Sequence, residues 1–226
     1  MCDEIRFLCW NVRGLNNPAR CAAVRAMVQD SRATVVCLQE TKLQQVSAQD
    51  IAGLLGPDFA DNFSFLPANG SRGGIILAAS NRFFCLYNFS LTPNTISATI
   101  SWSADGTCWR LTGVYGPQGE AQKTEFIREL RELASSQGQN WLVLGDFNLI
   151  YRAADKNNNL LNRRLMDRFK HALNRLSLRK LCLSGRRFTW LDIAQESRAL
   201  SPAERNLHAS MKHKFAGLAA IAKSRA

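Results

Sequence analysis

Five polar side chains in this 226-residue sequence stand at the ends of apolar segments, where buried strands would stop. They are Asn11, Glu40, Tyr115, Asp146 and Asn148. The segment 141–150, Trp-Leu-Val-Leu-Gly-Asp-Phe-Asn-Leu-Ile, shows the pattern most clearly, because Asp146 and Asn148 follow a run that belongs inside a protein. A buried carboxylate without a partner costs several kcal/mol or takes up a proton. Asp146 therefore needs a partner.

These side chains would converge if the strand ends gather at one edge of packed sheets. Two carboxylates brought together, here Glu40 and Asp146, repel each other unless a cation lies beside them. Mg²⁺, or Mn²⁺ in its place, suits such a site, since Mg²⁺ takes oxygen ligands and binds through one or two carboxylates, waters and substrate phosphate. Asn and Tyr side chains donate hydrogen bonds to phosphate oxygens. The set predicts metal-assisted attack of water on a phosphodiester.

Each of these residues alone has an ordinary structural explanation. A single Glu at a strand end, such as Glu40, is usually a surface residue. An Asp-Phe-Asn sequence, as at 146–148, is more often a turn in which the Asp side chain accepts a backbone hydrogen bond. The combination, in this order, is what favours a catalytic site.

The elements that would position these residues alternate between strands and helices. Asn17 and Pro18 are typical of a helix N-cap and first turn, and Asp105-Gly106 is typical of a hairpin. Strands are predicted within 4–15, 33–41, 69–80, 96–115, 141–150 and 186–190. Helices are predicted within 16–30, 123–137 and 162–178. This mixture favours sheets packed on each other and covered by helices.

The net charge of +11 lies entirely in one part of the chain. Residues 1–162 carry 14 basic and 14 acidic side chains, whereas residues 163–226 carry 15 basic and 4 acidic ones. Such a block is compatible with a polyanionic partner, most often nucleic acid, and equally with a solvated basic face.

Composition also bears on where the protein works. No apolar run approaches the roughly 18 residues of a membrane span, and acidic residues stand where a signal peptide is basic. The seven cysteines form no Cys-x-x-Cys pair, and several lie inside apolar runs. We expect a reduced, intracellular protein, nuclear or cytoplasmic, with thiols in its core and no membrane partner.

Two sets of motifs carry a family resemblance. Four short ones are Cys-Trp-Asn-Val-Arg-Gly-Leu, Cys-Leu-Gln-Glu-Thr-Lys, Val-Tyr-Gly-Pro and Leu-Gly-Asp-Phe-Asn-Leu-Ile, at 9–15, 37–42, 114–117 and 144–150. Three further segments lie at 70–77, 155–169 and 185–190. The first set resembles the endonuclease/exonuclease/phosphatase superfamily, which includes DNase I and abasic-site endonucleases. The second resembles the endonuclease domain of plant-type non-LTR retrotransposons (LINE elements).

The resemblance covers about residues 5–190 and implies a DNase I-like α/β fold. This is a four-layer sandwich of two packed, mostly antiparallel β-sheets flanked by helices, with the active site at one edge. The partner would be nucleic acid, expected to be DNA, held through the basic region 163–226.

The resemblance also assigns roles to the five polar residues. Glu40 would bind the metal, and Asn11 would support it. Tyr115 would contact the scissile phosphate. Asp146 would orient or deprotonate the attacking water, or protonate the leaving group. Asn148 would hold a phosphate oxygen.

The family pattern ends in a Ser-Asp-His motif that this sequence lacks. Its three histidines are His171, His208 and His213, and none follows an Asp. We therefore expect residues 1–190 to form a nuclease domain that is incomplete at its C-terminal end, after an internal deletion in the genome or in the gene model.

A basic amphipathic helical tail is expected over 191–226. Its signals are a capping box at Ser201–Glu204 and an apolar stripe. The stripe consists of Leu207, Met211, Phe215, Leu218 and Ala222.

Three functions are compatible with these observations. The first is an Mg²⁺-dependent endonuclease whose activity is impaired or lost for want of Ser-Asp-His. The second is a non-catalytic, nucleic-acid-binding remnant of a retroelement. The third is a translation product that folds poorly.

Overall fold

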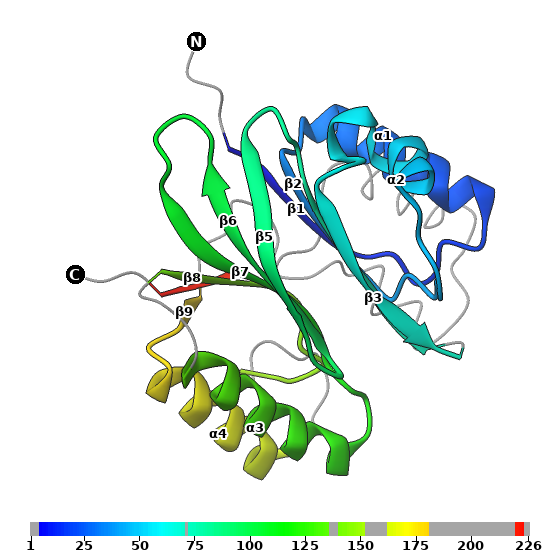
Figure 1. The fold of residues 1–226 in the computed structure, drawn as a ribbon. Coiled ribbons are helices and arrows are strands. Elements are labelled where there is room, and N and C mark those ends of the chain that lie inside the picture. The colour runs from blue at the N-terminus through cyan, green and yellow to red at the C-terminus, as the bar shows by residue number, and fades with distance from the viewer. Residues whose placement is uncertain (1–4, 71, 136–139, 152–161, 181–219, 224–226) are drawn as a thin grey trace.

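Two β-sheets pack face to face, with helices on both outer faces (Figure 1). The computed structural model describes residues 5–70, 72–135, 140–151, 162–180 and 220–223. Within these residues the first sheet has four strands, in the order β1 (Phe7–Asn11), β2 (Val35–Gln39), β4 (Arg72–Ala79) and β3 (Phe63–Asn69). The second has six, in the order β5 (Phe84–Leu91), β6 (Thr95–Trp102), β7 (Cys108–Tyr115), β8 (Trp141–Asp146), β10 (Ala220–Lys223) and β9 (Arg179–Lys180).

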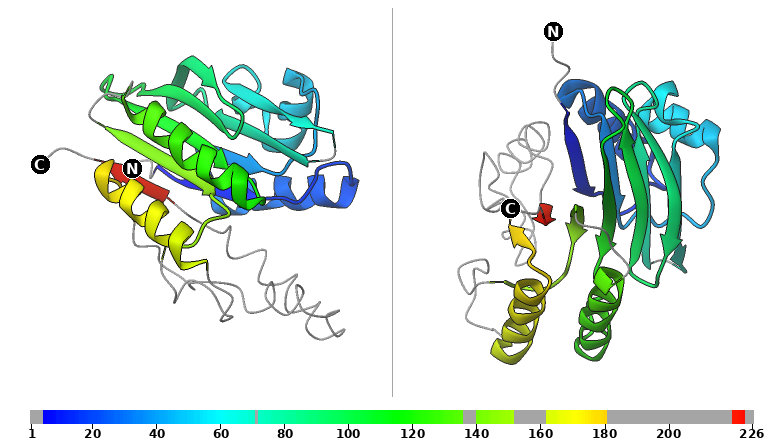
Figure 2. Two further views of the ribbon diagram at one scale, coloured as in Figure 1. Left: turned by 90° about the horizontal axis from the view of Figure 1, so that it is seen from below. Right: turned by 60° about the vertical axis from the view of Figure 1, so that its left-hand side comes forward.

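Helices complete the four layers, as predicted. The described helices are α1 (Pro18–Ser31), α2 (Ala48–Leu55), the short 3₁₀ helix η1 (Pro57–Phe59), α3 (Glu120–Ser135) and α4 (Arg163–Arg175). The first two cover the outer face of the four-stranded sheet, and α3 and α4 lie side by side against the second sheet (Figure 2). Strand pairs β1–β2 and β7–β8 are parallel, and the other described pairs are antiparallel.

Three apolar clusters fill the spaces between the layers. The central one lies between the sheets and includes Cys37, Leu77 and Leu111 at 0% exposure. All five residues of β2 are buried, and the first four of them are apolar, as a strand covered on both faces requires. The third cluster joins β7 and β8 to the inner faces of α3 and α4. The strands that end at the candidate site are therefore held on both faces.

Local signals explain the helix boundaries. Asn17 caps α1, since its Oδ1 accepts the Ala19 N–H at 2.8 Å, and Pro18 opens the first turn. The predicted apolar face of α3 is buried, including Phe126 and Leu130. The structure adds a helix that is not among the predicted elements. This helix is α2, and Ser47 and Asp50 start it with a capping box.

The end of the predicted helical tail is a strand. Ala222, placed above on a helical stripe, lies in β10 and pairs antiparallel with Leu142 of β8. The strand predicted at 186–190 and the rest of the stripe, from Leu207 to Leu218, lie outside the described residues. None of the described helices is long and apolar enough to cross a membrane.

A buried amide and two thiols meet between β1 and β2. Cys9 and Cys37 are register partners. Gln39 donates its Nε2 hydrogens to the Cys37 carbonyl at 2.8 Å and to the sulfurs of Cys9 and Cys37 at 3.2 and 3.1 Å. The hydrogen bond with Cys37 and burial raise the pKa of the Cys9 thiol well above its ordinary value. These thiols belong to the core, as predicted.

Asn62 joins the two sheets where the chain passes from one to the other. Its Nδ2 donates to the carbonyls of Ala79, in β4, and Phe84, in β5, at 2.9 and 2.8 Å. Its Oδ1 accepts the Leu86 N–H at 2.8 Å. Asn62 is 7% exposed, so water cannot replace these bonds.

Replacing Asn62 with alanine is expected to lower the free energy of unfolding by about 2–3 kcal/mol, because buried backbone groups lose their partners. Urea denaturation followed by tryptophan fluorescence measures the change. The matched control is Asn69→Ala, an exposed asparagine at the end of β3, which should change stability by less than about 0.5 kcal/mol. Equal losses in the two variants would show that Asn62 does not join the sheets.

Candidate active site

The predicted polar residues do meet at one edge of the two sheets. In the first sheet Asn11 is paired with Gln39, which places it beside Glu40. In the second sheet Tyr115 is paired with Asp146. A hydrogen bond of 3.1 Å from Asn11 Nδ2 to Asp146 Oδ2 joins the two pairs across the sheets. The C-terminal ends of strands β1, β2, β7 and β8 thus lie together at this edge.

Asp146 has a defined partner on each carboxylate oxygen. Its Oδ2 accepts the Asn11 amide, and its Oδ1 accepts the Asn148 N–H at 2.9 Å. The second contact is the Asx turn considered above as the ordinary alternative, so Asp146 forms that turn and also faces the site. Both contacts hold the carboxylate in place, and each donor is an uncharged N–H group.

Asn148 connects the loop after β8 to the loop after β7. Its backbone is left-handed, with φ 48°, which Asn tolerates better than most residues. Its Nδ2 donates to the Gly116 carbonyl at 2.6 Å, and the Gly116 N–H donates to the Asp146 carbonyl at 2.7 Å. The Asn148 amide keeps a second N–H that can serve a ligand.

Glu40 stands just beyond β2 in a left-handed conformation, with φ 54°. Lys42 Nζ lies 3.6 Å from Glu40 Oε1. The Lys42 side chain is 34% exposed and the Glu40 side chain 19%. The Glu40 carbonyl accepts the Gly14 N–H at 2.7 Å, which ties this loop to the loop after β1. The carboxylate is therefore held at the edge of the sheet and already has one cation as a neighbour.

Tyr115 lies close to both carboxylates. Partial burial, the charge of Glu40, a hydrogen bond with Glu40 and the charge of Asp146 raise the pKa of Tyr115 to about 12. At neutral pH the phenol keeps its proton and can donate it in a hydrogen bond. Because the folded-state pKa exceeds the ordinary value of 10, this group's contribution to stability is present below pH 10 and is lost as the pH rises toward 12.

The donor set fits one hard divalent cation. No three His, Cys, Asp or Glu side chains cluster anywhere in the described part of the chain. Mg²⁺ needs fewer protein ligands than that, because waters and substrate phosphate complete its shell. The Asn11 Oδ1 accepts a hydrogen bond from the Arg13 N–H at 3.2 Å, and the Asn11 Nδ2 donates to Asp146. Asn11 therefore orients Asp146, and Glu40 is the carboxylate best placed to hold a metal.

A basic pocket of about 300 Å³ adjoins this site and is not among the predicted features. Its lining residues are Arg13, Gly14, Asn16, Asn17, Arg20 and Lys42. The Arg20 guanidinium donates to the carbonyls of Arg13 and Gly14 and so braces the loop. The sequence does hold a sign of this pocket, because Arg13 and Lys42 belong to the same motifs as Asn11 and Glu40.

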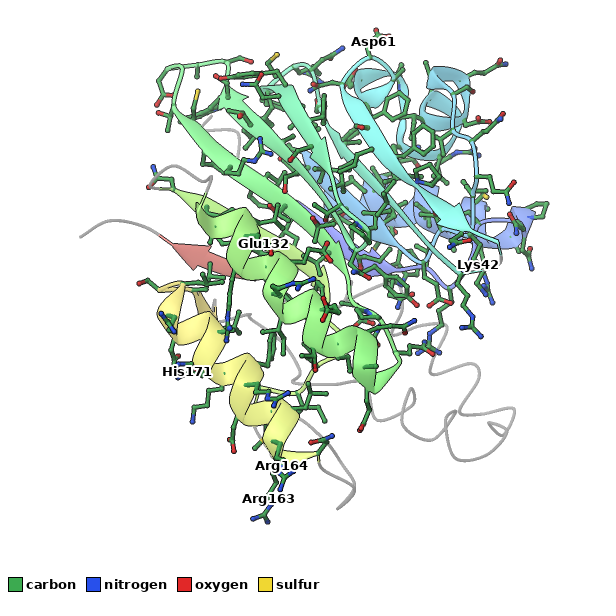
Figure 3. The ribbon with its side chains drawn as sticks, turned by 60° about the horizontal axis from the view of Figure 1, so that its bottom comes forward. Lys42, Asp61, Glu132, Arg163, Arg164 and His171 are labelled. Carbon is green, nitrogen blue, oxygen red and sulfur yellow. The ribbon has the colours of Figure 1, made fainter. Side chains whose placement is uncertain are left out.

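His171 does not take part in the site. It is exposed on α4, on the side of the molecule away from Lys42 (Figure 3). The other two histidines lie outside the described residues.

Comparison with known proteins fits this arrangement. The sequence matches the Endonuclease/Exonuclease/phosphatase family over residues 8–205, most of its length. The chain belongs to this family. The match continues past residue 190, the predicted end of the domain. No curated protein matches the sequence significantly.

Solved structures share the family fold at low sequence identity. The human Nocturnin catalytic domain with bound sulfate has a TM-score of 0.57 at 14% identity, over 97% of this chain and 82% of its own. D. rerio TDP2 in complex with a single-strand DNA product gives 0.54 at 14% identity, over 97% and 84%. The endonuclease domain of TRAS1, a telomere-specific non-LTR retrotransposon, gives 0.54 at 12% identity, over 80% and 76%.

Proposed function

We propose that the protein hydrolyses phosphodiester bonds in nucleic acid, as an endonuclease, with the help of Mg²⁺ or Mn²⁺. The observation that carries this proposal is the hydrogen bond between Asn11 of one sheet and Asp146 of the other, with Glu40 and Tyr115 at the same edge. DNA is the proposed polymer, since the retroelement motifs resemble DNA-cleaving domains. An intracellular location, nuclear or cytoplasmic, follows from that substrate.

Each residue of the site has its own role in the proposed hydrolysis. A cation at Glu40 would supply charge neutralisation at the phosphate. Asp146, held by Asn11 and by the Asn148 N–H, orients a water and accepts its proton, or returns a proton to the leaving oxygen. Tyr115 remains protonated at neutral pH and donates to a phosphate oxygen. The second N–H of the Asn148 amide does the same.

Charge around the site supports a polyanionic substrate. The basic pocket presents Arg13, Arg20 and Lys42 beside the carboxylates. On α4 the exposed charged residues are Arg163, Arg164, Asp167, Arg168, Lys170 and Arg175, together with His171. The Arg163 and Arg164 side chains extend outward from the first turn of the helix (Figure 3). Positive groups in two places would hold the backbone of a nucleic acid across the protein.

We propose a rate lower than that of members with Ser-Asp-His, because the sequence lacks that motif. Losing one group that stabilises the transition state typically costs about 10²–10⁴-fold. The alternative is a binding protein without catalysis, and the exposed cations of α4 favour it independently of the carboxylates.

Plasmid nicking by purified protein tests the proposal. Supercoiled DNA is incubated with Mg²⁺, Mn²⁺, Ca²⁺ or EDTA, with Glu40→Gln as a variant that keeps the shape of the side chain. We expect slow nicking that requires Mg²⁺ or Mn²⁺ and is lost in the variant. Nicking that persists in EDTA, or equally in the variant, would reject the proposal. DNA binding without nicking would favour the alternative.

Replacing Arg13 with asparagine is expected to weaken DNA binding about three- to tenfold and to reduce the slope of log K against log salt by about 1, because one phosphate contact is lost. Asparagine tolerates the left-handed backbone of Arg13, φ 53°. Fluorescence anisotropy over a KCl series measures both quantities. The control is Arg82→Gln, which removes an exposed cation paired with Asp58 at 3.8 Å. An unchanged slope would mean that the pocket does not hold phosphate.

A further inference from the structure

We infer that Glu129, on α3, is a positioning residue for Tyr115 and acts through Asn94. This inference rests on the proposed function, because it assigns a purpose to an interaction at the rear of that site. No family motif quoted above includes Glu129 or Asn94. The structure links the two residues to Tyr115 through consecutive hydrogen bonds.

The Glu129 carboxylate binds the turn between β5 and β6. Its Oε1 accepts the Asn94 N–H at 3.1 Å and the Thr92 hydroxyl. Its Oε2 accepts the Asn94 Nδ2 at 2.7 Å. Thr92 Oγ1 also lies 2.6 Å from Thr95 Oγ1. One carboxylate therefore receives three donors, two of them from Asn94, and holds the backbone and the side chain of that residue.

Asn94 in turn holds the backbone of Tyr115. The last register pair of β6 and β7 is Thr95 with Val114. One residue further on, the Tyr115 N–H donates to the Asn94 carbonyl at 3.0 Å. This bond extends the pairing of β6 and β7 to the last residue of β7. On its other side Tyr115 is paired with Asp146. The backbone position of Tyr115 thus depends on Asp146 on one side and, on the other side, on Asn94, which Glu129 holds.

The arrangement matters because Tyr115 stands at the end of a strand. Strand ends fray when the last hydrogen bonds lack support. A charged acceptor forms stronger hydrogen bonds than a neutral one, and Glu129 is partly shielded from water. An ordinary surface glutamate on the same helix differs: Glu125, one turn earlier, is 63% exposed and contacts Arg128. Glu129 and Glu125 therefore form a matched pair for experiment.

Amide hydrogen exchange measured by NMR tests the link without any need for activity. In Glu129→Gln the Oε2 acceptor becomes a donor facing the Asn94 amide. We expect the Tyr115 amide to exchange about tenfold faster or more, while core amides such as Val143 keep their rates. Glu125→Gln should leave both unchanged. If Glu129 only stabilised the whole fold, the slowest core amides would speed up by the same factor as Tyr115, and the inference would fail.

Asn94→Ala is the second variant, in case Glu129→Gln does not fold. It removes the side-chain contact to Glu129 and keeps the carbonyl that Tyr115 uses. Faster exchange at Tyr115 is expected here too, by a smaller factor, because the Asn94 N–H can still bind the carboxylate. Unchanged exchange in this variant, with Glu129→Gln also silent or unfolded, would overturn the inference.

A double-mutant cycle adds the functional readout. With a nicking assay in hand, Glu129→Gln should lower kcat about three- to tenfold with little change in KM, and should have no further effect once Tyr115→Phe has removed the phenol. Additive losses would contradict positioning through Tyr115. Should the wild-type protein show no nicking, the proposed function fails, while the exchange result still decides the role of Glu129.

Discussion

Replacing Asp146 with asparagine is expected to lower Mg²⁺-dependent nicking by about 10²–10⁴-fold, the usual cost of losing a general acid or base. The substitution keeps the size of the side chain but removes the charge that can accept a proton from water. It also places an amide group opposite the Asn11 Nδ2. The Oδ1 of Asn11 is already bound to the Arg13 N–H. Single-turnover nicking rates measure the effect, with circular dichroism melts to verify folding.

The control for this prediction is Asp61→Asn, which removes one carboxylate of the same kind at a distant, exposed position (Figure 3). Its nicking rate should equal that of the wild type. A rate within threefold of the wild type in Asp146→Asn would instead mean that the water is activated by another group. Equal losses in both variants would point to net charge as the cause.

Replacing Gly145 with alanine is expected to lower the free energy of unfolding by about 3–5 kcal/mol, the sum of backbone strain and forced displacement in a packed core. Gly145 has φ 141°, which side chains rarely adopt, and an added Cβ would lie 2.0 Å from the Val114 carbonyl oxygen. The parallel pair β7–β8 would have to separate next to Tyr115 and Asp146. Urea denaturation measures the loss, and nicking should disappear with it.

Gly53→Ala is the matched control, because Gly53 lies inside α2 with only a flexible arginine end 3.9 Å from an added Cβ. Alanine there should raise stability by about 0.5–1 kcal/mol, since glycine disfavours helix interiors. A Gly145→Ala protein as stable as the wild type would show that β7 and β8 can move apart at no cost.

The sequence predicted the parts of the site that local chemistry encodes. Asn11, Tyr115 and Asp146 could be found because each closes an apolar run with a polar group. The contact from Asn11 to Asp146 could not, because it depends on how two sheets pack, 135 residues apart in the chain. Glu129 looked no different from Glu125, since only the tertiary position of Asn94 separates them.

The missed and mistaken elements have similar causes. Strand β5 escaped prediction because its second half is exposed and is interrupted at Asn88, which has φ 52°. Strand β3 contains Pro67, which favours a loop but is tolerated at the edge of a sheet. The segment 220–223 has a helical pattern, yet it pairs with β8, because a distant hydrogen-bonding partner overrides local preference.

The two core thiols give the protein an internal chemical probe of its folded state. Cys9 and Cys37 are 1% and 0% exposed, whereas Cys85 and Cys108 lie on the surface. A thiol reagent added to the native protein labels the surface pair at once and reaches the buried pair only when the two sheets separate. Peptide mapping separates these four thiols from the other three cysteines of the chain. The fraction of Cys9 and Cys37 that stays unlabelled therefore reports the fraction of molecules whose sheets are closed. A preparation that nicks no DNA can thus be sorted into folded protein without catalysis and protein that never folded.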